Sequence, residues 1–166
     1  MKAALFSIAQ TDGGALLIGP RPPSRSLEQW CAQLAARQID QVISLLSDAE
    51  VATFDLGDEE TLLNGLGIGF TRFPVEDFGI PDPEAFRHLV SDICAQLRGG
   101  KTVLAHCAAG VGRSGTVAAC VITAFGRDAE KAMVEVSAAR GMVSPETSAQ
   151  RDFVRSFGLA TGVTLA

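Results

Sequence analysis

The sequence predicts a single α/β domain with a mostly parallel central sheet and helices on both faces. Short apolar runs alternate with longer amphipathic stretches, which is typical of consecutive strand and helix units. Glycine and proline mark many of the junctions between them. The length of 166 residues, with 47% hydrophobic residues, suits one buried core. We expect one domain over 1–166, with its core at about 15–157 and a tail at 159–166 that frays.

The N-terminal half is expected to contain four strands and three helices. Residues 3–9 are apolar, and we interpret them as a strand rather than a signal peptide, because the run is short and lacks a clear cleavage site. Residues 15–18 form a second apolar run that a Gly-Pro pair ends. Ser26 and Gln29 have capping-box spacing and open an amphipathic helix to about Arg37. The next elements are expected to be a strand at 41–46, helices at 48–54 and 59–66, and a strand at 68–73.

The C-terminal half is expected to be mainly helical. Pro83 suits the first turn of a helix that ends before Gly99, and a strand at 102–105 follows. Residues 114–125 are small and β-branched, so periodicity alone allows a strand. Their length and their apolar character all round favour a buried central helix. The last two helices are expected from Asp128 to about Arg140 and from Ser144-Pro145 to about Phe157.

The most informative segment is the stretch 103–115, which reads VLAHCAAGVGRSG. It places Cys107 after an apolar run, and five residues separate Cys107 from Arg113. This layout suits chemistry on a phosphate ester, in which a thiolate attacks phosphorus while backbone N–H groups and a guanidinium hold the oxygens. Glycines let the backbone wrap closely around a small anion, and a following helix adds its N-terminal N–H groups. The predicted phosphate-binding loop consists of Ala108, Ala109, Gly110, Val111, Gly112 and Arg113.

This segment resembles the signature loop of the cysteine-dependent protein tyrosine phosphatase superfamily. Residues 73–82 are similar to the loop that carries the general acid in dual-specificity and cyclin-kinase-associated phosphatases, and Asp77 precedes Cys107 by thirty residues, as in those compact enzymes. The resemblance runs from about Leu17 to Phe157 and is strongest for the compact dual-specificity branch. The matched loop positions are His106, Cys107, Gly110, Gly112, Arg113 and Ser114.

Three residues of the loop are candidates for the chemistry itself. Cys107 is the expected nucleophile, since N–H groups, a helix N-terminus and Arg113 all favour a thiolate; the alternative is a buried structural cysteine. Arg113 would bind two phosphoryl oxygens and stabilise the charge of the transition state. Ser114 has two compatible roles, as a helix cap or as a donor to the Cys107 sulfur, and the resemblance implies the second.

Asp77 is the expected general acid, which protonates the leaving group and then takes a proton from water. Asp82 lies between two prolines and is better suited to capping the next helix, and Glu76 is a third candidate. His106 is expected to hold the shape of the loop through hydrogen bonds from its ring to loop carbonyls. Gln150 lies where relatives carry a glutamine that orients the hydrolytic water, although a glutamine on a helix face is usually only solvated.

Composition excludes several classes of protein. The net charge of −5 argues against a general nucleic-acid or anionic-membrane binder, and no apolar run approaches the length of a membrane span. The four cysteines have irregular spacing, which predicts neither a disulfide framework nor a zinc site. Cys31, Cys94 and Cys120 fall on apolar helix faces and are expected to be structural. We expect no metal or cofactor, and a cytoplasmic setting that keeps the nucleophile reduced.

Three functions remain open at this point. The first is a phosphoprotein phosphatase of the tyrosine or dual-specificity type, acting through a phospho-cysteine. The second is a phosphatase of a small metabolite such as an inositol phosphate, and the third is a non-catalytic phosphate-binding module. The loop interior lacks the lysines that phosphoinositide phosphatases often place there, which disfavours the second. The chain has no tyrosine with which to build a deep phosphotyrosine slot, so a shallow pocket is expected.

Overall fold

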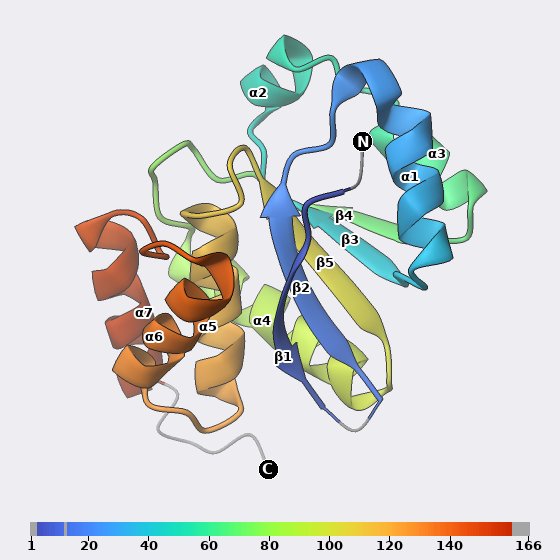
Figure 1. Cartoon of the computed structure of the whole chain (residues 1–166). Coiled ribbons are helices and arrows are strands. Elements are labelled where there is room, and N and C mark those ends of the chain that lie inside the picture. The colour runs from blue at the N-terminus through green and yellow to red at the C-terminus, as the bar shows by residue number, and fades with distance from the viewer. Residues whose placement is uncertain (1–2, 12, 161–166) are drawn as a thin grey trace.

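The computed structural model describes residues 3–11 and 13–160 (Figure 1). A five-stranded sheet in the order β1-β2-β5-β3-β4 lies at its centre. β1 pairs antiparallel with β2, and the other three strand pairs are parallel, which confirms the expected α/β fold with a mostly parallel sheet. The strands are β1 (Phe6–Gln10), β2 (Ala15–Pro20), β3 (Gln41–Ser44), β4 (Gly69–Arg72) and β5 (Thr102–Cys107).

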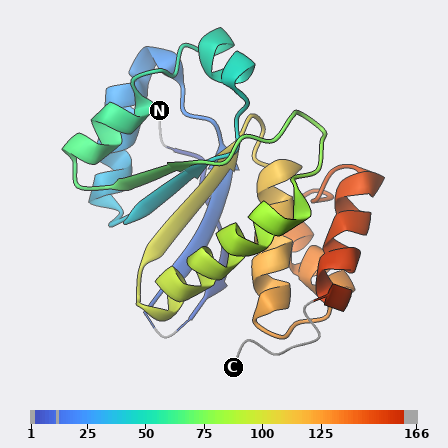
Figure 2. The same cartoon turned by 180° about the vertical axis from the view of Figure 1, so that it is seen from behind.

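Helices cover both faces of this sheet (Figure 1, Figure 2). α1 and α3 share one buried apolar cluster with β3, and α4 to α7 share a second cluster on the opposite face. All twelve residues of α5 are buried, because it lies between the sheet and the three helices around it. The helices are α1 (Leu27–Ala36), α2 (Asp48–Thr53), α3 (Glu59–Gly65), α4 (Pro83–Arg98), α5 (Arg113–Ala124), α6 (Ala129–Arg140) and α7 (Ser148–Ala160).

The helix predicted at 114–125 is confirmed, although its sequence also allowed a strand. Small and β-branched side chains let a helix pack closely on all sides, and this requirement outweighs their preference for strands. The prediction that Asp82 caps the helix after it is also confirmed, since its side chain accepts from the Ala85 N–H at 2.9 Å.

Ser26 is the N-cap of α1, as predicted, but the capping box expected there is absent, and one other predicted helix start is wrong. Ser26 makes no capping hydrogen bond with its side chain, because residues 24–26 form a short 3₁₀ turn that leads into α1. The capping box occurs instead at α2, where Ser47 and Glu50 each accept a hydrogen bond from the backbone of the other. Ser144-Pro145 does not open the last helix, which begins at Ser148.

Strand and helix ends differ from the predictions by a few residues. The first strand runs over Phe6–Gln10 rather than 3–9, because its register is set by pairing with β2. β5 extends to Cys107, two residues beyond its predicted end. α7 passes through Gly158 to Ala160, so glycine does not stop it there, and the rest of the expected frayed tail lies outside the described residues. Within the described part of the chain, no helix is both long and apolar enough to cross a membrane.

Candidate active site

The candidate site lies where parallel strands end at one edge of the sheet. In the strand register, Pro20 of β2 is the partner of Cys107, and Ser44 of β3 is the partner of His106. The chain then forms the predicted phosphate-binding loop and enters α5 at Arg113. Ligands of open α/β sheets bind at the carboxyl ends of the strands, and a helix N-terminus favours anions. The fold therefore places this loop where an anion is best held.

The loop requires glycine at Gly110. This residue has a φ of 69°, a conformation that side chains other than glycine rarely adopt. A Cβ at Gly110 would also overlap the backbone of Gly19 and Pro20 at the end of β2. The loop backbone is therefore in direct contact with the neighbouring strand, and its path is fixed on that side.

Cys107 and Ser114 are brought together by the loop. Cys107 is 2% exposed, and its Sγ accepts from the Gly110 N–H at 3.3 Å and lies 3.4 Å from Ser114 Oγ. Ser114 is fully buried and is the second residue of α5, and the residue in the capping position is Gly112. Ser114 is therefore not the helix cap, which leaves its contact with the sulfur as the role that the geometry permits.

Arg113 binds one carboxylate from α2 and one from the loop between β4 and α4. It is buried, and its Nη1 and Nη2 atoms donate to the two carboxylate oxygens of Glu50 at 2.6 and 2.8 Å. Nη2 also donates to Asp77 Oδ1 at 3.0 Å, and Nη1 donates to the carbonyl of Val75 at 2.9 Å. The hydrogen bond from Arg113 lowers the pKa of Glu50. The pair therefore stabilises the folded protein at neutral pH, and this stabilisation is lost only as the pH falls through the lowered pKa. Glu50 was not among the predicted site residues.

Asp77 lies close to the loop, and Asp82 does not contact it. The Asp77 carboxylate is 54% exposed, and it accepts from Arg113 and from the Phe78 N–H at 3.1 Å. Asp82 is occupied as the cap of α4, and Glu76 is exposed to solvent. Of the three predicted acid candidates, only Asp77 is joined to the phosphate-binding loop.

His106 does not make the contacts that the sequence predicted. Its Nε2 lies 2.9 Å from Glu59 Oε1 and not beside a loop carbonyl, and both side chains are buried. Nδ1 has no hydrogen-bond partner among the described residues. The ring packs against Trp30 in a T-shaped arrangement, with a centroid distance of 6.1 Å. The prediction is wrong because a carboxylate 47 residues away, at the first turn of α3, reaches the ring. His106 thus joins β5 to α3 through a buried polar pair.

Gln150 is buried rather than solvated. It is 1% exposed, and it exchanges two hydrogen bonds with Thr147 in a capping box at the start of α7. Its Nε2 also donates to the carbonyl of Gly79 at 3.2 Å, in the loop that carries Asp77. A Cβ at Gly112 would lie 2.9 Å from Gln150 Oε1, so the carboxamide is in contact with the phosphate-binding loop. Gln150 therefore joins α7 to both loops of the site.

Two residues that the sequence did not indicate hold the loop from outside. Arg140 Nε donates to the carbonyl of Gly110 at 2.6 Å, and its Nη2 donates to that of Ala109 at 3.3 Å. Ser144 Oγ donates to the carbonyl of Val111 at 2.6 Å. Each lies 30 or more residues after the loop residue that it binds, so no short-range pattern connects them. With these carbonyls held outward, the loop keeps one backbone conformation.

The other three cysteines are buried, as predicted. Burial is the main cause that raises the pKa of the Cys31 thiol to about 11 and that of the Cys94 thiol to about 11. Desolvation also raises the pKa of Cys120. Each is therefore a protonated thiol in the hydrophobic core. Among the described residues, no group of three or more His, Cys, Asp or Glu side chains is placed to hold a metal ion.

Comparisons with known proteins agree with this geometry. The rat protein cyclin-dependent kinase inhibitor 3 is 23% identical over 135 residues, which are 80% of this chain and 64% of that protein. The chain thus spans less than two thirds of the length of that relative. The crystal structure of kinase-associated phosphatase, with serine in place of its catalytic-site cysteine, is 18% identical with a TM-score of 0.88 and covers 98% of each chain. The active form of Tk-PTP is 27% identical with a TM-score of 0.75, covering 92% of this chain and 96% of that one.

The family comparison covers almost the whole chain. Residues 14–161 match the family PTP-SAK, described as the Swiss Army Knife protein, DSP-PTPase phosphatase domain. This range contains both loops of the candidate site and every strand except β1. This match confirms the resemblance to compact dual-specificity phosphatases that the loop sequence indicated. The chain belongs to the PTP-SAK family of dual-specificity phosphatase domains.

Proposed function

We propose that this protein hydrolyses phosphomonoesters on phosphoproteins through a phospho-cysteine formed on Cys107. One observation carries the proposal: a cysteine, a serine, an arginine and an aspartate meet at one loop, at the N-terminus of a buried helix. A module that only binds phosphate has no use for the acid or for the serine beside the sulfur. A reducing, cytoplasmic setting belongs to the same proposal, because an oxidised Cys107 has no nucleophilic sulfur.

In the first step, the Cys107 thiolate attacks phosphorus. The S–P bond forms as the P–O bond to the leaving group breaks, and Asp77 gives its proton to the leaving oxygen. Loop N–H groups and the Arg113 guanidinium hold the equatorial oxygens, whose charge is stabilised in the transition state. Arg113 Nη2 exchanges its bond with Asp77 for one with the phosphate, and that exchange frees Asp77 for the leaving group. Glu50 keeps the guanidinium in place throughout.

In the second step, water attacks the phospho-cysteine. The P–S bond breaks, inorganic phosphate leaves, and the Asp77 carboxylate accepts the proton of the water. The departing thiolate receives hydrogen bonds from the Ser114 hydroxyl and the Gly110 N–H. These donors lower the energy of the leaving sulfur. Gln150 lies against the loop, where its carboxamide is suited to orienting the water.

The loop itself favours a phosphoprotein over a polyphosphorylated metabolite. Its interior residues Ala108, Ala109 and Val111 offer no side-chain cation for a second phosphate. Arg140 is close by, but its Nε and Nη2 donate to loop carbonyls on the outer side. A ring bearing several phosphates needs several cations, which this loop does not supply.

A substrate panel in excess chelator tests the proposal. We expect turnover of phosphotyrosine, phosphoserine or phosphothreonine peptides, unchanged by the chelator, at higher kcat/KM than inositol phosphates or nucleotides. Much faster hydrolysis of one metabolite than of any phosphopeptide would contradict the phosphoprotein assignment. Loss of all activity in chelator would contradict the cysteine mechanism.

Replacing Asp77 by Asn is expected to slow hydrolysis of substrates with poor leaving groups about a hundredfold or more, in line with general-acid contributions. Asparagine keeps the shape of the side chain and the hydrogen bond from the Phe78 N–H, but it has no proton to give. The loss should shrink for an activated aryl phosphate, whose leaving group departs without a proton. Steady-state kcat on an alkyl and an activated aryl phosphate measures both effects.

Asp82→Asn is the matched control for this variant. Asparagine caps a helix as well as aspartate does, so α4 and the rate should both be preserved. If Asp82→Asn loses activity while Asp77→Asn keeps it, the acid has been assigned to the wrong aspartate.

A further inference from the structure

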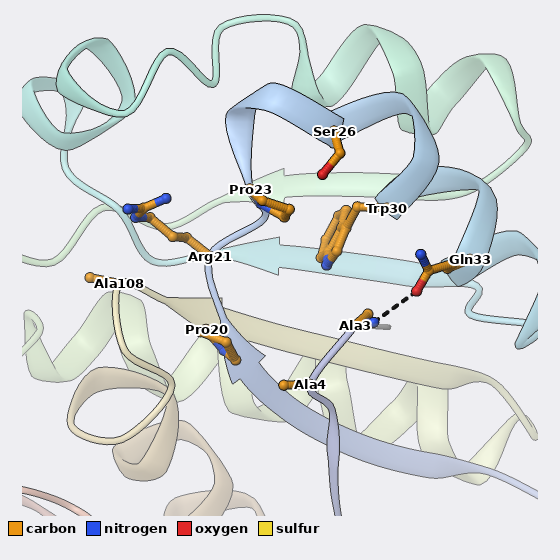
Figure 3. Close-up of a pocket in the computed structure, with 9 residues that line it drawn as sticks. All are labelled: Ala3, Ala4, Pro20, Arg21, Pro23, Ser26, Trp30, Gln33 and Ala108. Atoms are coloured by element: carbon orange, nitrogen blue, oxygen red, sulfur yellow. Dashed lines mark hydrogen bonds between the residues drawn. The ribbon is translucent and has the colours of Figure 1, made fainter. Parts of the chain in front are cut away.

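A cavity of about 290 Å³ lies beside the phosphate-binding loop, between the end of β2 and α1 (Figure 3). Pro20, Pro23 and Trp30 give it apolar walls, and Arg21 lies at one end next to Ala108 of the loop. The remaining lining residues are Ala3, Ala4, Ser26 and Gln33. The hydrogen bond from the Ala3 N–H to Gln33 Oε1, at 2.7 Å, closes the opposite end (Figure 3). The mechanism above makes no use of this cavity.

Arg21 is held in place but is not paired with an acid. Its backbone N–H donates to the carbonyl of Ala108 at 3.2 Å, which ties this residue to the loop. Its guanidinium stacks on the ring of Phe54, with Cζ 4.0 Å from the ring centroid. The side chain makes one long hydrogen bond, of 3.4 Å, from Nη1 to the carbonyl of Pro22. In residues 3–11 and 13–160, no carboxylate forms an ion pair with it, so its fork of donors is oriented and available.

The position of Arg21 in the strand register fixes how far it lies from the reacting phosphate. Pro20 and Cys107 are register partners on adjacent strands, which lie roughly 4.8 Å apart in a sheet. Arg21 is the next residue, so its side chain begins beside the residue that follows the nucleophile. An extended peptide advances about 3.3 Å per residue. A group bound by Arg21 therefore belongs to a residue within about three positions of the one whose phosphate occupies the loop.

We propose that this cavity is a substrate subsite in which Arg21 binds an acidic side chain of the phosphopeptide, within three residues of the phosphorylated one. The inference rests on the proposed function and specifies its substrate class. A guanidinium fork matches a carboxylate in geometry and charge, and the proline and tryptophan walls suit the methylene groups that carry it. One cation with apolar walls fits one carboxylate, and it does not fit the several phosphates of a polyphosphorylated metabolite.

Matched peptides test this subsite. One phosphotyrosine peptide carries glutamates within three residues of the phosphate, and the other carries glutamines at the same positions. We expect the wild-type protein to prefer the acidic peptide by roughly fivefold in kcat/KM, mainly through KM, as for a partly exposed ion pair. Arg21→Gln should bring this ratio close to one, and Arg21→Lys should retain only part of it. The preference should also weaken as salt is raised.

Arg25→Gln is the control, because this neighbouring arginine is exposed in the 3₁₀ turn and does not line the cavity. It should keep the wild-type ratio. Equal kcat/KM for the two peptides in the wild-type protein would overturn the proposal without any variant. Arg21→Gln could instead lower kcat/KM for an inositol bisphosphate and leave the ratio between the two peptides unchanged. That result would overturn the proposal in favour of a metabolite substrate. Wild-type turnover of an aryl phosphate is measured alongside, because its absence would instead mean that the proposed function itself has failed.

Discussion

Cys107→Ser is expected to abolish turnover, with a loss on the order of 10⁵-fold or more, comparable with the removal of a nucleophile from other enzymes. The hydroxyl of serine is not ionised at neutral pH and attacks phosphorus far more weakly than a thiolate. Serine is close to cysteine in size, and the Gly110 N–H and Ser114 hydroxyl still have an acceptor. Phosphate or vanadate binding should therefore survive, which calorimetry of the variant measures.

Cys94→Ala is the matched control, since Cys94 is a fully buried cysteine in the second half of α4 and not part of the phosphate-binding loop. We expect a lower Tm from lost packing, with kcat preserved. Undiminished turnover in Cys107→Ser would reject the phospho-cysteine mechanism, and equal losses in the two variants would point to damaged folding.

Arg113→Lys is expected to lower kcat/KM by about 10³-fold, in the range found when a preorganised donor to a transition-state oxygen is removed. An ammonium is a single point of charge, so it cannot bind Glu50 and two phosphoryl oxygens side by side. Activity against an aryl phosphate, together with inhibition by vanadate, measures the loss, and both should weaken. Retention of vanadate affinity in this variant would contradict the assigned role.

Glu50→Gln separates positioning from binding in the same network. The carboxamide keeps one acceptor for Arg113 but loses the charge and the second acceptor, so the guanidinium is less firmly oriented. We expect a smaller loss than in Arg113→Lys, and it should fall on kcat more than on vanadate binding. A thermal unfolding curve for each variant shows how much of the effect is loss of stability.

The parts of the site that the sequence predicted are those set by local chemistry. The path of the loop is fixed by Gly110 and its positive φ, and the cap at Asp82 by neighbouring prolines. The same local reasoning failed at Ser26, where a pattern similar to that of Ser47 formed no capping box. The outcomes differ because Ser47 has an extended backbone, whereas the 3₁₀ turn before α1 gives Ser26 a different conformation, with φ of −142° and ψ of 36°.

Most of the site contacts that the sequence did not predict are long-range. Arg113 meets Glu50 across 63 residues, and His106 meets Glu59 across 47. Arg140 reaches the loop from 30 residues away. In the sequence, Glu59 cannot be told from an acidic residue at the start of any surface helix. Only the packing of α3 against the sheet gives Glu59 its role.

The protonation of the three core thiols also decides how this protein reacts with electrophiles. With a pKa of about 11, only about one molecule in ten thousand of Cys31 or Cys94 is in the reactive form at pH 7. Burial also raises the pKa of Cys120 well above its ordinary value. The sulfur of Cys107 instead lies at the start of the phosphate-binding loop, where it accepts from the Gly110 N–H. The protein therefore offers one addressable sulfur out of four, so a covalent probe can count working sites in a preparation without removing any other cysteine.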